Sequence, residues 1–129
     1  MQAKGGFEVQ LNPQPLAGEV SQAGLNRMSI NKVFHGDLEA TSLGEMLAAS
    51  TAVEGSAGYV AMERVTGRLN GRSGSFVLQH TASMRRGTPQ LSISVVPDSA
   101  TDELAGLSGQ MQIEITDGKH AYTFDYMIV

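Results

Sequence analysis

The sequence predicts a single all-β domain of antiparallel strands over residues 1–129, because alternating apolar and polar residues twice flank a two-residue turn. Asn70-Gly71 divides one alternating stretch, Tyr59 to Met84, and Asp117-Gly118 divides another near the C-terminus. Asn-Gly and Asp-Gly supply the two positive-φ positions that a type I′ hairpin turn requires. Both turns bring apolar residues opposite one another, and two such coincidences favour an antiparallel β domain.

The first hairpin sets a register that can be counted outward from its turn. Leu69 lies opposite Arg72, and the pairs that follow are Val65 with Phe76, Glu63 with Leu78, Ala61 with His80, and Tyr59 with Ala82. These residues share one face of the sheet, since side chains alternate along a strand. We assign that face to the interior; its members are Tyr59, Val65, Phe76, Leu78, Met84, Glu63 and His80. In the second hairpin Ile115, Ile113 and Met111 face His120, Tyr122 and Phe124.

The remaining elements follow in chain order. A strand is expected over 6–12, stopped by Pro13 and Pro15, followed by a loop over 16–25. A long strand is expected over 26–40, with a bulge at Gly36. Residues 42–51 carry both a capping-box pattern and residues that suit a strand, and we favour the strand. A strand over 90–96 ends at Pro97, and 99–107 is compatible with one helical turn.

Composition narrows the classes of protein. Nine Lys and Arg residues against 13 Asp and Glu give a net charge of −4, which argues against a nucleic-acid partner. The absence of cysteine excludes disulfides and a thiol nucleophile. The first residues, Met1 to Phe7, lack an apolar signal core, and no apolar run approaches the ~20 residues of a membrane helix. We therefore expect a soluble cytoplasmic protein without a membrane partner.

About eight strands must either close into a barrel or form two packed sheets, and periodicity does not separate these. Four segments resemble a known bacterial family: 36–39 (GDLE), 58–63 (GYVAME), 69–76 (LNGRSGSF) and 78–80 (LQH). The family consists of small uncharacterised proteins, a domain of unknown function whose fold resembles the allene oxide cyclase barrel. The resemblance runs from Phe7 to Tyr126 and implies a single antiparallel eight-stranded barrel of allene oxide cyclase-like or calycin-like form. It implies no activity and no cofactor.

Glu63 and His80 form the candidate site, as diagonal neighbours on the inward face at the ~7–8 Å spacing that long side chains can bridge. Beside a cavity, Glu63 could act as general base and His80 as acid or oxyanion donor for an isomerisation of a small apolar substrate. The alternative is that the two residues only satisfy each other's polar groups inside a filled barrel, and we favour this alternative. The residues expected to surround a lumen ligand are Tyr59, Glu63, Phe76, Leu78, His80, Tyr122 and Phe124.

Other polar residues give weaker signals. His35, Asp37 and Glu39 share a face at a spacing that can serve a metal, but without a fuller ligand motif we read them as solvent-facing and assign no metal site. His120 follows the Asp117-Gly118 turn and is expected at the surface. Arg85-Arg86 is expected to form a solvated hairpin tip.

Three kinds of function remain open. The first is binding of a small apolar molecule in the lumen, which in an eight-stranded barrel can be filled by side chains or hold one small ligand. The second is a cofactor-free isomerase or cyclase that uses Glu63 and His80. The third is a structural barrel that forms a homodimer through an outward strip of Val60, Met62 and Val77.

Overall fold

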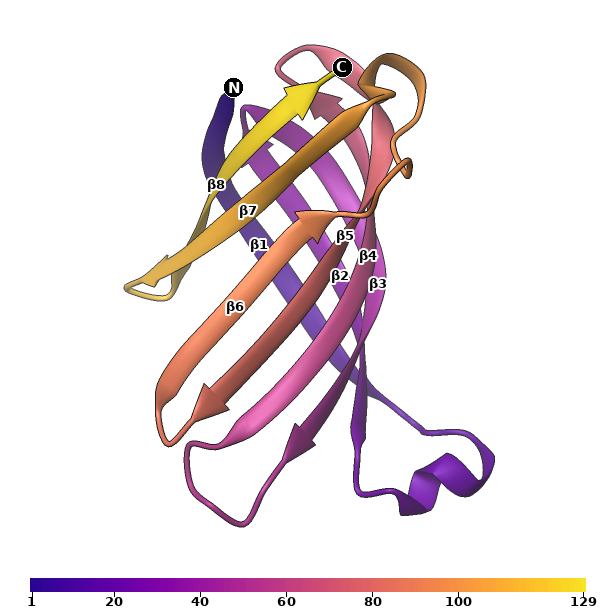
Figure 1. Cartoon of the computed structure of the whole chain (residues 1–129), viewed down its shortest axis with the longest axis vertical. Helices are drawn as coiled ribbons and strands as arrows, with labels where there is room; N and C mark the ends of the chain where they lie inside the picture. Colours follow the sequence, from indigo (N-terminus) through magenta and orange to yellow (C-terminus); the bar gives the residue numbers. More distant parts are fainter.

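A computed structural model describes all 129 residues and shows eight antiparallel strands that close into a barrel, each next to its neighbours in chain order (Figure 1). The strands are β1 (Gln2–Gln14), β2 (Asn26–Gly36), β3 (Leu38–Ser50), β4 (Ala57–Leu69), β5 (Arg72–Arg85), β6 (Thr88–Val95), β7 (Leu107–Thr116) and β8 (Lys119–Ile128). Two short 3-10 segments, η1 (Gly18–Gln22) and η2 (Asp102–Leu104), lie in loops. The predicted all-β barrel is confirmed. None of the helical segments has the length and apolar character that a membrane-spanning helix needs.

The register of both predicted hairpins is confirmed. Leu69 pairs with Arg72, Glu63 with Leu78, and Ala61 with His80. Ile115 pairs with His120 and Met111 with Phe124. The turn residues have the positive φ that type I′ geometry needs, 47° at Asn70 and 86° at Gly71. Local turn chemistry therefore fixed which residues face inward on four strands.

The expected long strand over 26–40 is wrong, because the chain reverses at Gly36-Asp37 between β2 and β3. Gly36 has a φ of 102°, and a Cβ there would lie 2.7 Å from the Lys4 backbone oxygen on β1. The glycine thus allows a corner rather than a bulge. The strand favoured for 42–51 is confirmed as part of β3, and the helical turn expected within 99–107 is η2.

The first strand runs past its expected end at Asn12. Pro13 pairs with Met28 of β2, and β8 has already ended its pairing with β1 at Phe7. Beyond Phe7, β1 therefore has a neighbouring strand on one side only. No strand on the other side needs a backbone N–H from residue 13, so β1 tolerates the proline.

One half of the barrel is filled with side chains. Its largest buried members are Phe34, Phe76, Phe124, Leu38, Leu69 and Leu78. The rings of Phe76 and Phe124 stack with their centroids 5.8 Å apart. The two chain termini lie together at this end, where the Met1 amino group donates to the Tyr126 backbone oxygen at 2.9 Å (Figure 1).

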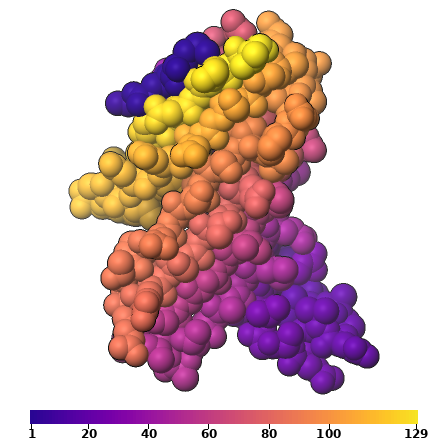
Figure 2. Space-filling model, viewed as in Figure 1, coloured from indigo at the N-terminus to yellow at the C-terminus, as the bar shows by residue number.

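The other half of the barrel is open along one side. β8 pairs with β1 only over Gln2–Phe7, and β7 pairs with β6 only at Ile93 and Ser94. Residues 8–14 of β1 and 88–92 of β6 consequently face each other across a gap in the wall, which we call the seam. In the space-filling view the molecule is notched between the gold tip of the β7–β8 hairpin and the orange β5–β6 hairpin (Figure 2).

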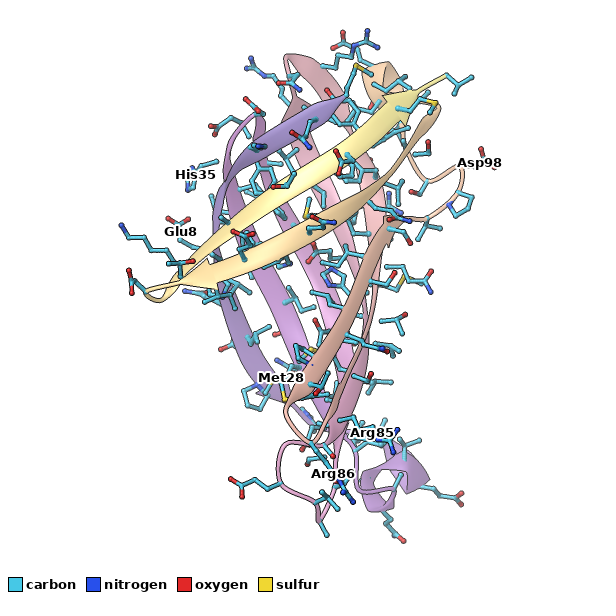
Figure 3. All side chains as sticks on the ribbon, turned by 60° about the vertical axis from the view of Figure 1, so that its left-hand side comes forward. Glu8, Met28, His35, Arg85, Arg86 and Asp98 are labelled. Carbon is cyan, nitrogen blue, oxygen red and sulfur yellow. The ribbon has the colours of Figure 1, made fainter.

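The seam explains why several inward-facing apolar residues contact solvent. Leu11 on β1 and Leu91 on β6 are each 46% exposed, and both lie on the edges of the seam. Met84 faces inward as assigned but is 43% exposed at the open end, and Ile115 is 65% exposed on the projecting β7–β8 hairpin. Met28 lies at this opening between β1 and β6 (Figure 3).

Candidate functional site

The open half of the barrel contains a hollow of about 490 Å³. Its apolar walls come from inward-facing residues of β3, β4, β5 and β6, namely Ala48, Tyr59, Ala82, Met84 and Leu91. Because two of these wall residues are alanines, adjacent strands leave space that larger side chains occupy in the filled half. The hollow has the concave and mainly apolar form of small-molecule sites.

The loop between β3 and β4, residues 51–56, closes the far end of the hollow. Two hydrogen bonds fasten this loop to the β5–β6 turn. Gly87 N–H donates to the Gly55 oxygen at 3.0 Å, and Arg86 N–H donates to Ser56 Oγ at 3.0 Å. These hydrogen bonds hold the end of the hollow in place, and residues 89–91 on the β6 edge of the seam line its side.

A second depression of the same volume lies near this turn but differs in chemistry. It is lined by Ser83, Arg85, Arg86, Thr88 and Gln90, with no apolar residue. Arg85 and Arg86 are exposed at the hairpin tip, as expected from the sequence (Figure 3). We regard the apolar hollow as the candidate site, because the arginine depression has no apolar wall and all of its lining residues are exposed.

Four buried polar side chains form a layer in the barrel interior. They are Lys32, Ser42, Glu63 and His80, and they are the buried polar or charged residues of the chain. They come from the consecutive strands β2, β3, β4 and β5, where Lys32 pairs with Ser42 and the other two lie along the same inward face. We call this set the polar layer.

Glu63 is the centre of the polar layer. Lys32 Nζ donates a hydrogen bond to Glu63 Oε1 at 3.2 Å and lies 3.0 Å from Oε2. His80 Nε2 is 3.6 Å from Oε1, which is too long for a hydrogen bond. Lys32 Nζ also lies 4.9 Å from the centre of the Phe7 ring, a cation–π distance. The carboxylate is thus balanced by an ammonium group that is itself held by an aromatic ring.

The charges around Glu63 decide its ionisation. Burial raises the pKa of Glu63, but the neighbouring His80 imidazole and the Lys32 ammonium group lower it by more, so its pKa lies below the ordinary 4.5. Glu63 is therefore a carboxylate at neutral pH. Its negative charge acts on Tyr59, whose pKa is raised first by burial and then by this charge.

Gly44 makes the close approach of β3 to Glu63 sterically feasible. It pairs with Glu63, and a Cβ at Gly44 would lie 2.1 Å from the Met62 oxygen and 2.7 Å from Glu63 Cα. No side chain larger than hydrogen fits there without separating the strands. The position of Glu63 in the wall thus depends on a glycine in the next strand.

The structure separates the predicted site residues into two groups. Glu63 and His80 are diagonal neighbours as expected, but they are only 1% and 4% exposed and do not line the hollow. Phe76, Leu78, Tyr122 and Phe124 pack in the core of the barrel. Of the seven residues expected around a ligand, Tyr59 alone lines the hollow.

Lys32 and Ser42 are the members of the polar layer that sequence reasoning did not include, and of these two Lys32 carried a signal. The signal for Lys32 was its position in the strand, because it lies on the same face as the apolar residues Met28 and Ile30. A lysine at such a position requires a buried partner. Only the pairing of β2, β3 and β4 shows that Glu63 is this partner.

The other polar candidates lie elsewhere. His35 is exposed, with its Nε2 2.8 Å from Glu8 Oε2 (Figure 3) and its Nδ1 4.0 Å from Glu39 Oε2. Asp37 Oδ2 accepts from the Lys4 N–H at 2.9 Å. No group of three or more His, Asp or Glu side chains is arranged to hold a metal ion. His120 is half-buried rather than at the surface, because its ring lies 5.0 Å from that of Phe7.

The fold and the hollow define a small antiparallel β-barrel with one filled half and one open half. Residues 3–126 match the family described as "Protein of unknown function (DUF3224)", and the chain belongs to this family. A crystal structure of a DUF3224 protein with unknown function from Shewanella oneidensis MR-1 is similar, with a TM-score of 0.93 and 49% sequence identity over 100% of this chain and 97% of that one. No curated protein matches the chain significantly. The resemblance to a family of uncharacterised bacterial barrels is confirmed.

Proposed function

We propose that the protein binds a small, mostly apolar molecule in the hollow of the open half. The observation that carries this proposal is the contrast between the two halves, since one is packed with aromatic and leucine side chains and the other encloses about 490 Å³ between apolar walls. Leu91, which lines the hollow, is 46% exposed and leaves apolar surface in water unless something covers it. A small apolar ligand would remove that surface from water.

The seam is the entrance in this proposal. A strand from another protein is a less suitable occupant, because both edges of the seam contain a proline, Pro13 on β1 and Pro89 on β6. Proline removes a backbone donor and is one of the devices that protect sheet edges from strand addition. A small molecule needs no backbone pairing and can pass between the edges.

The catalytic alternative receives less support. A cofactor-free isomerase or cyclase would need Glu63 or His80 within reach of a substrate atom. Both side chains are buried outside the lining of the hollow, and Glu63 is already paired with Lys32. Binding is therefore the function that the geometry supports best, without catalysis by this pair and without a cofactor. The likeness to allene oxide cyclases stays a prediction.

Titration with the uncharged fluorescent probe N-phenyl-1-naphthylamine tests the proposal. Ala48→Phe and Ala82→Phe would fill the hollow from two walls, whereas Ala49→Phe makes the same change at the neighbouring residue, which faces outward and does not line the hollow. We expect the two filling variants to weaken probe binding about tenfold or more, while the outer variant binds like the unmodified protein. Absence of binding, or equal binding by all four proteins, would overturn the proposal.

We also propose homodimer formation through the outward strip of Val60, Met62 and Val77 as a second candidate role. Val60 and Met62 are 53% and 50% exposed on the outer face of β4. Sedimentation velocity over a concentration series tests this role, and a monomer at every concentration would contradict it. The expected cytoplasmic location and the expected lack of nucleic-acid and membrane partners stay predictions.

A further inference from the structure

The hydroxyl of Tyr59 differs from the other tyrosine hydroxyls of the chain. The protein has three tyrosines. Tyr122 Oη donates to the His35 oxygen at 2.9 Å and accepts from the Leu38 N–H at 2.9 Å, and Tyr126 Oη accepts from Asn70 Nδ2 at 2.7 Å. The Tyr59 hydroxyl makes no hydrogen bond to the protein, and its pKa is raised by burial and by the charge of Glu63. Tyr59 is thus the tyrosine without a partner in the protein, and it is the one that lines the hollow.

The surroundings of Tyr59 offer little to its hydroxyl. Its cross-strand neighbours on the inward face are Ala48 and Ala82, and Leu91 pairs with Ala82 on the next strand. None of these three side chains has a polar atom. Two polar groups of the end loop are engaged elsewhere, since Thr51 Oγ1 donates to the Ser56 oxygen at 3.0 Å and Ser56 Oγ accepts from Arg86 N–H. Glu54 of the same loop also lines the hollow, but it makes no hydrogen bond to Tyr59. The Tyr59 hydroxyl is not sealed from solvent, so in the free protein water can take the place of a protein partner. Its missing partner is what a ligand could supply.

The charge of the site limits the chemistry of that ligand. The phenol of Tyr59 stays protonated at physiological pH, because burial and the nearby Glu63 carboxylate both raise its pKa. A protonated phenol offers a hydrogen-bond donor. The Glu54 carboxylate also lines the hollow, and it disfavours a second anion close to it. The complementary group is therefore an uncharged oxygen acceptor, such as a ketone, ester or ether, and not a carboxylate.

We propose that the Tyr59 hydroxyl is the specificity-determining donor of the hollow, and that the ligand is an uncharged apolar molecule with an acceptor oxygen. This inference rests on the proposed function, because it requires that the hollow binds a small molecule. It adds the chemical class of the ligand and the side chain that orients it. A hydrogen bond in such a wall selects against molecules that lack the oxygen, since they leave the phenol unpaired.

Two naphthalene probes test the inference, because they differ in one acceptor group. 6-Propionyl-2-dimethylaminonaphthalene carries a ketone and reports hydrogen bonding to it through its emission wavelength, whereas 2-dimethylaminonaphthalene lacks the ketone. Both are titrated into the unmodified protein, into Tyr59→Phe and into Tyr126→Phe. The last variant is the control, because it loses a tyrosine hydroxyl in the filled half.

The expected result is a loss of ketone-probe affinity of about two- to tenfold in Tyr59→Phe, with emission shifted to shorter wavelength. The probe without the ketone should bind equally to all three proteins, and Tyr126→Phe should bind both probes normally. Equal affinity and emission of the ketone probe in Tyr59→Phe would overturn this inference and leave the proposed function intact. Equally weaker binding of both probes to Tyr59→Phe would also overturn it, because the loss would then come from altered packing of the wall and not from the missing hydroxyl. Absence of binding of either probe to the unmodified protein would overturn both proposals.

Discussion

Lys32 Nζ lies 3.2 Å from Glu63 Oε1, and these residues form the lysine–carboxylate pair of the barrel in which both members are buried. The pair links β2 to β4 across Ser42 and Gly44 of β3. On the same inward face of β4, Val65 and Leu69 lie on one side of Glu63 in the core, and Tyr59 lies on the other side in the wall of the hollow. A charged layer therefore stands between the packed half and the open half.

Removing one partner of this pair should destabilise the barrel strongly. Glu63→Gln leaves a buried ammonium group without its counter-charge, and Lys32→Met leaves a buried carboxylate, each at a cost of about 3–5 kcal/mol. The double variant Lys32→Met/Glu63→Met should recover much of that loss, because an apolar pair leaves no unbalanced charge. Urea unfolding of the four proteins measures these differences. Single variants that are no less stable than the double variant would contradict the pairing.

The polar layer should also make stability sensitive to acid. The pKa of Glu63 is below its ordinary value of 4.5 in the folded protein, so the unfolded chain takes up this proton first as the pH falls. The contribution of Glu63 is complete above about pH 4.5 and declines as the pH falls from there through the folded pKa. Urea midpoints between pH 7 and pH 3 should fall less steeply for Glu63→Gln than for the unmodified protein. Parallel curves for the two proteins would count against this assignment.

Gly44 should be far less tolerant of substitution than a glycine nearby in the next strand. A Cβ at Gly44 would lie 2.1 Å from the Met62 backbone oxygen, whereas one at Gly58 would meet the Ala82 oxygen at 3.6 Å, an ordinary contact. Gly44→Ala should lower the melting temperature markedly or prevent folding, and Gly58→Ala should have little effect. Thermal unfolding followed by circular dichroism compares the two. Similar melting temperatures would show that β3 and β4 can separate at no cost.

The two seam prolines should keep the edges of the barrel from pairing with other chains. Pro13→Thr/Pro89→Thr restores an N–H and adds a residue that favours strands on both edges. We expect this variant to self-associate at concentrations where the unmodified protein does not. Size-exclusion chromatography with light scattering measures the change, with Pro97→Thr, outside any strand, as the control. An unchanged mass for the double variant would mean that the seam is closed to strands by other means.

Much of the fold was predictable because its signals are local. Asn70-Gly71 and Asp117-Gly118 set the register of two hairpins, and strand alternation then placed Glu63 and His80 inside the barrel. The corner at Gly36 was missed because apolar residues alternate on both sides of it, so 26–40 reads as one strand. The contact that makes a glycine necessary there is with Lys4 of β1, which is distant in sequence.

The candidate site was predictable only in part, because its form depends on where strands stop pairing. Alternation predicts that Met84 and Ile115 face inward, but it does not predict that β7 leaves β6 after two residue pairs. That early divergence opens the seam and exposes both residues. Lys32 could have been predicted to be buried, because it shares a strand face with Met28 and Ile30. The hollow, in contrast, arises from strand lengths and from the small side chains of Ala48 and Ala82.

The central claim is that the hollow holds a small apolar molecule, and native mass spectrometry of the freshly purified protein tests it most directly. The account predicts a mass above that of the 129-residue chain, and release on denaturation of an uncharged, oxygen-containing apolar compound that extraction can identify. The Ala82→Phe variant should carry less of it. A mass equal to that of the bare chain, unchanged after incubation with extracted cellular lipids and other apolar metabolites, would contradict the claim.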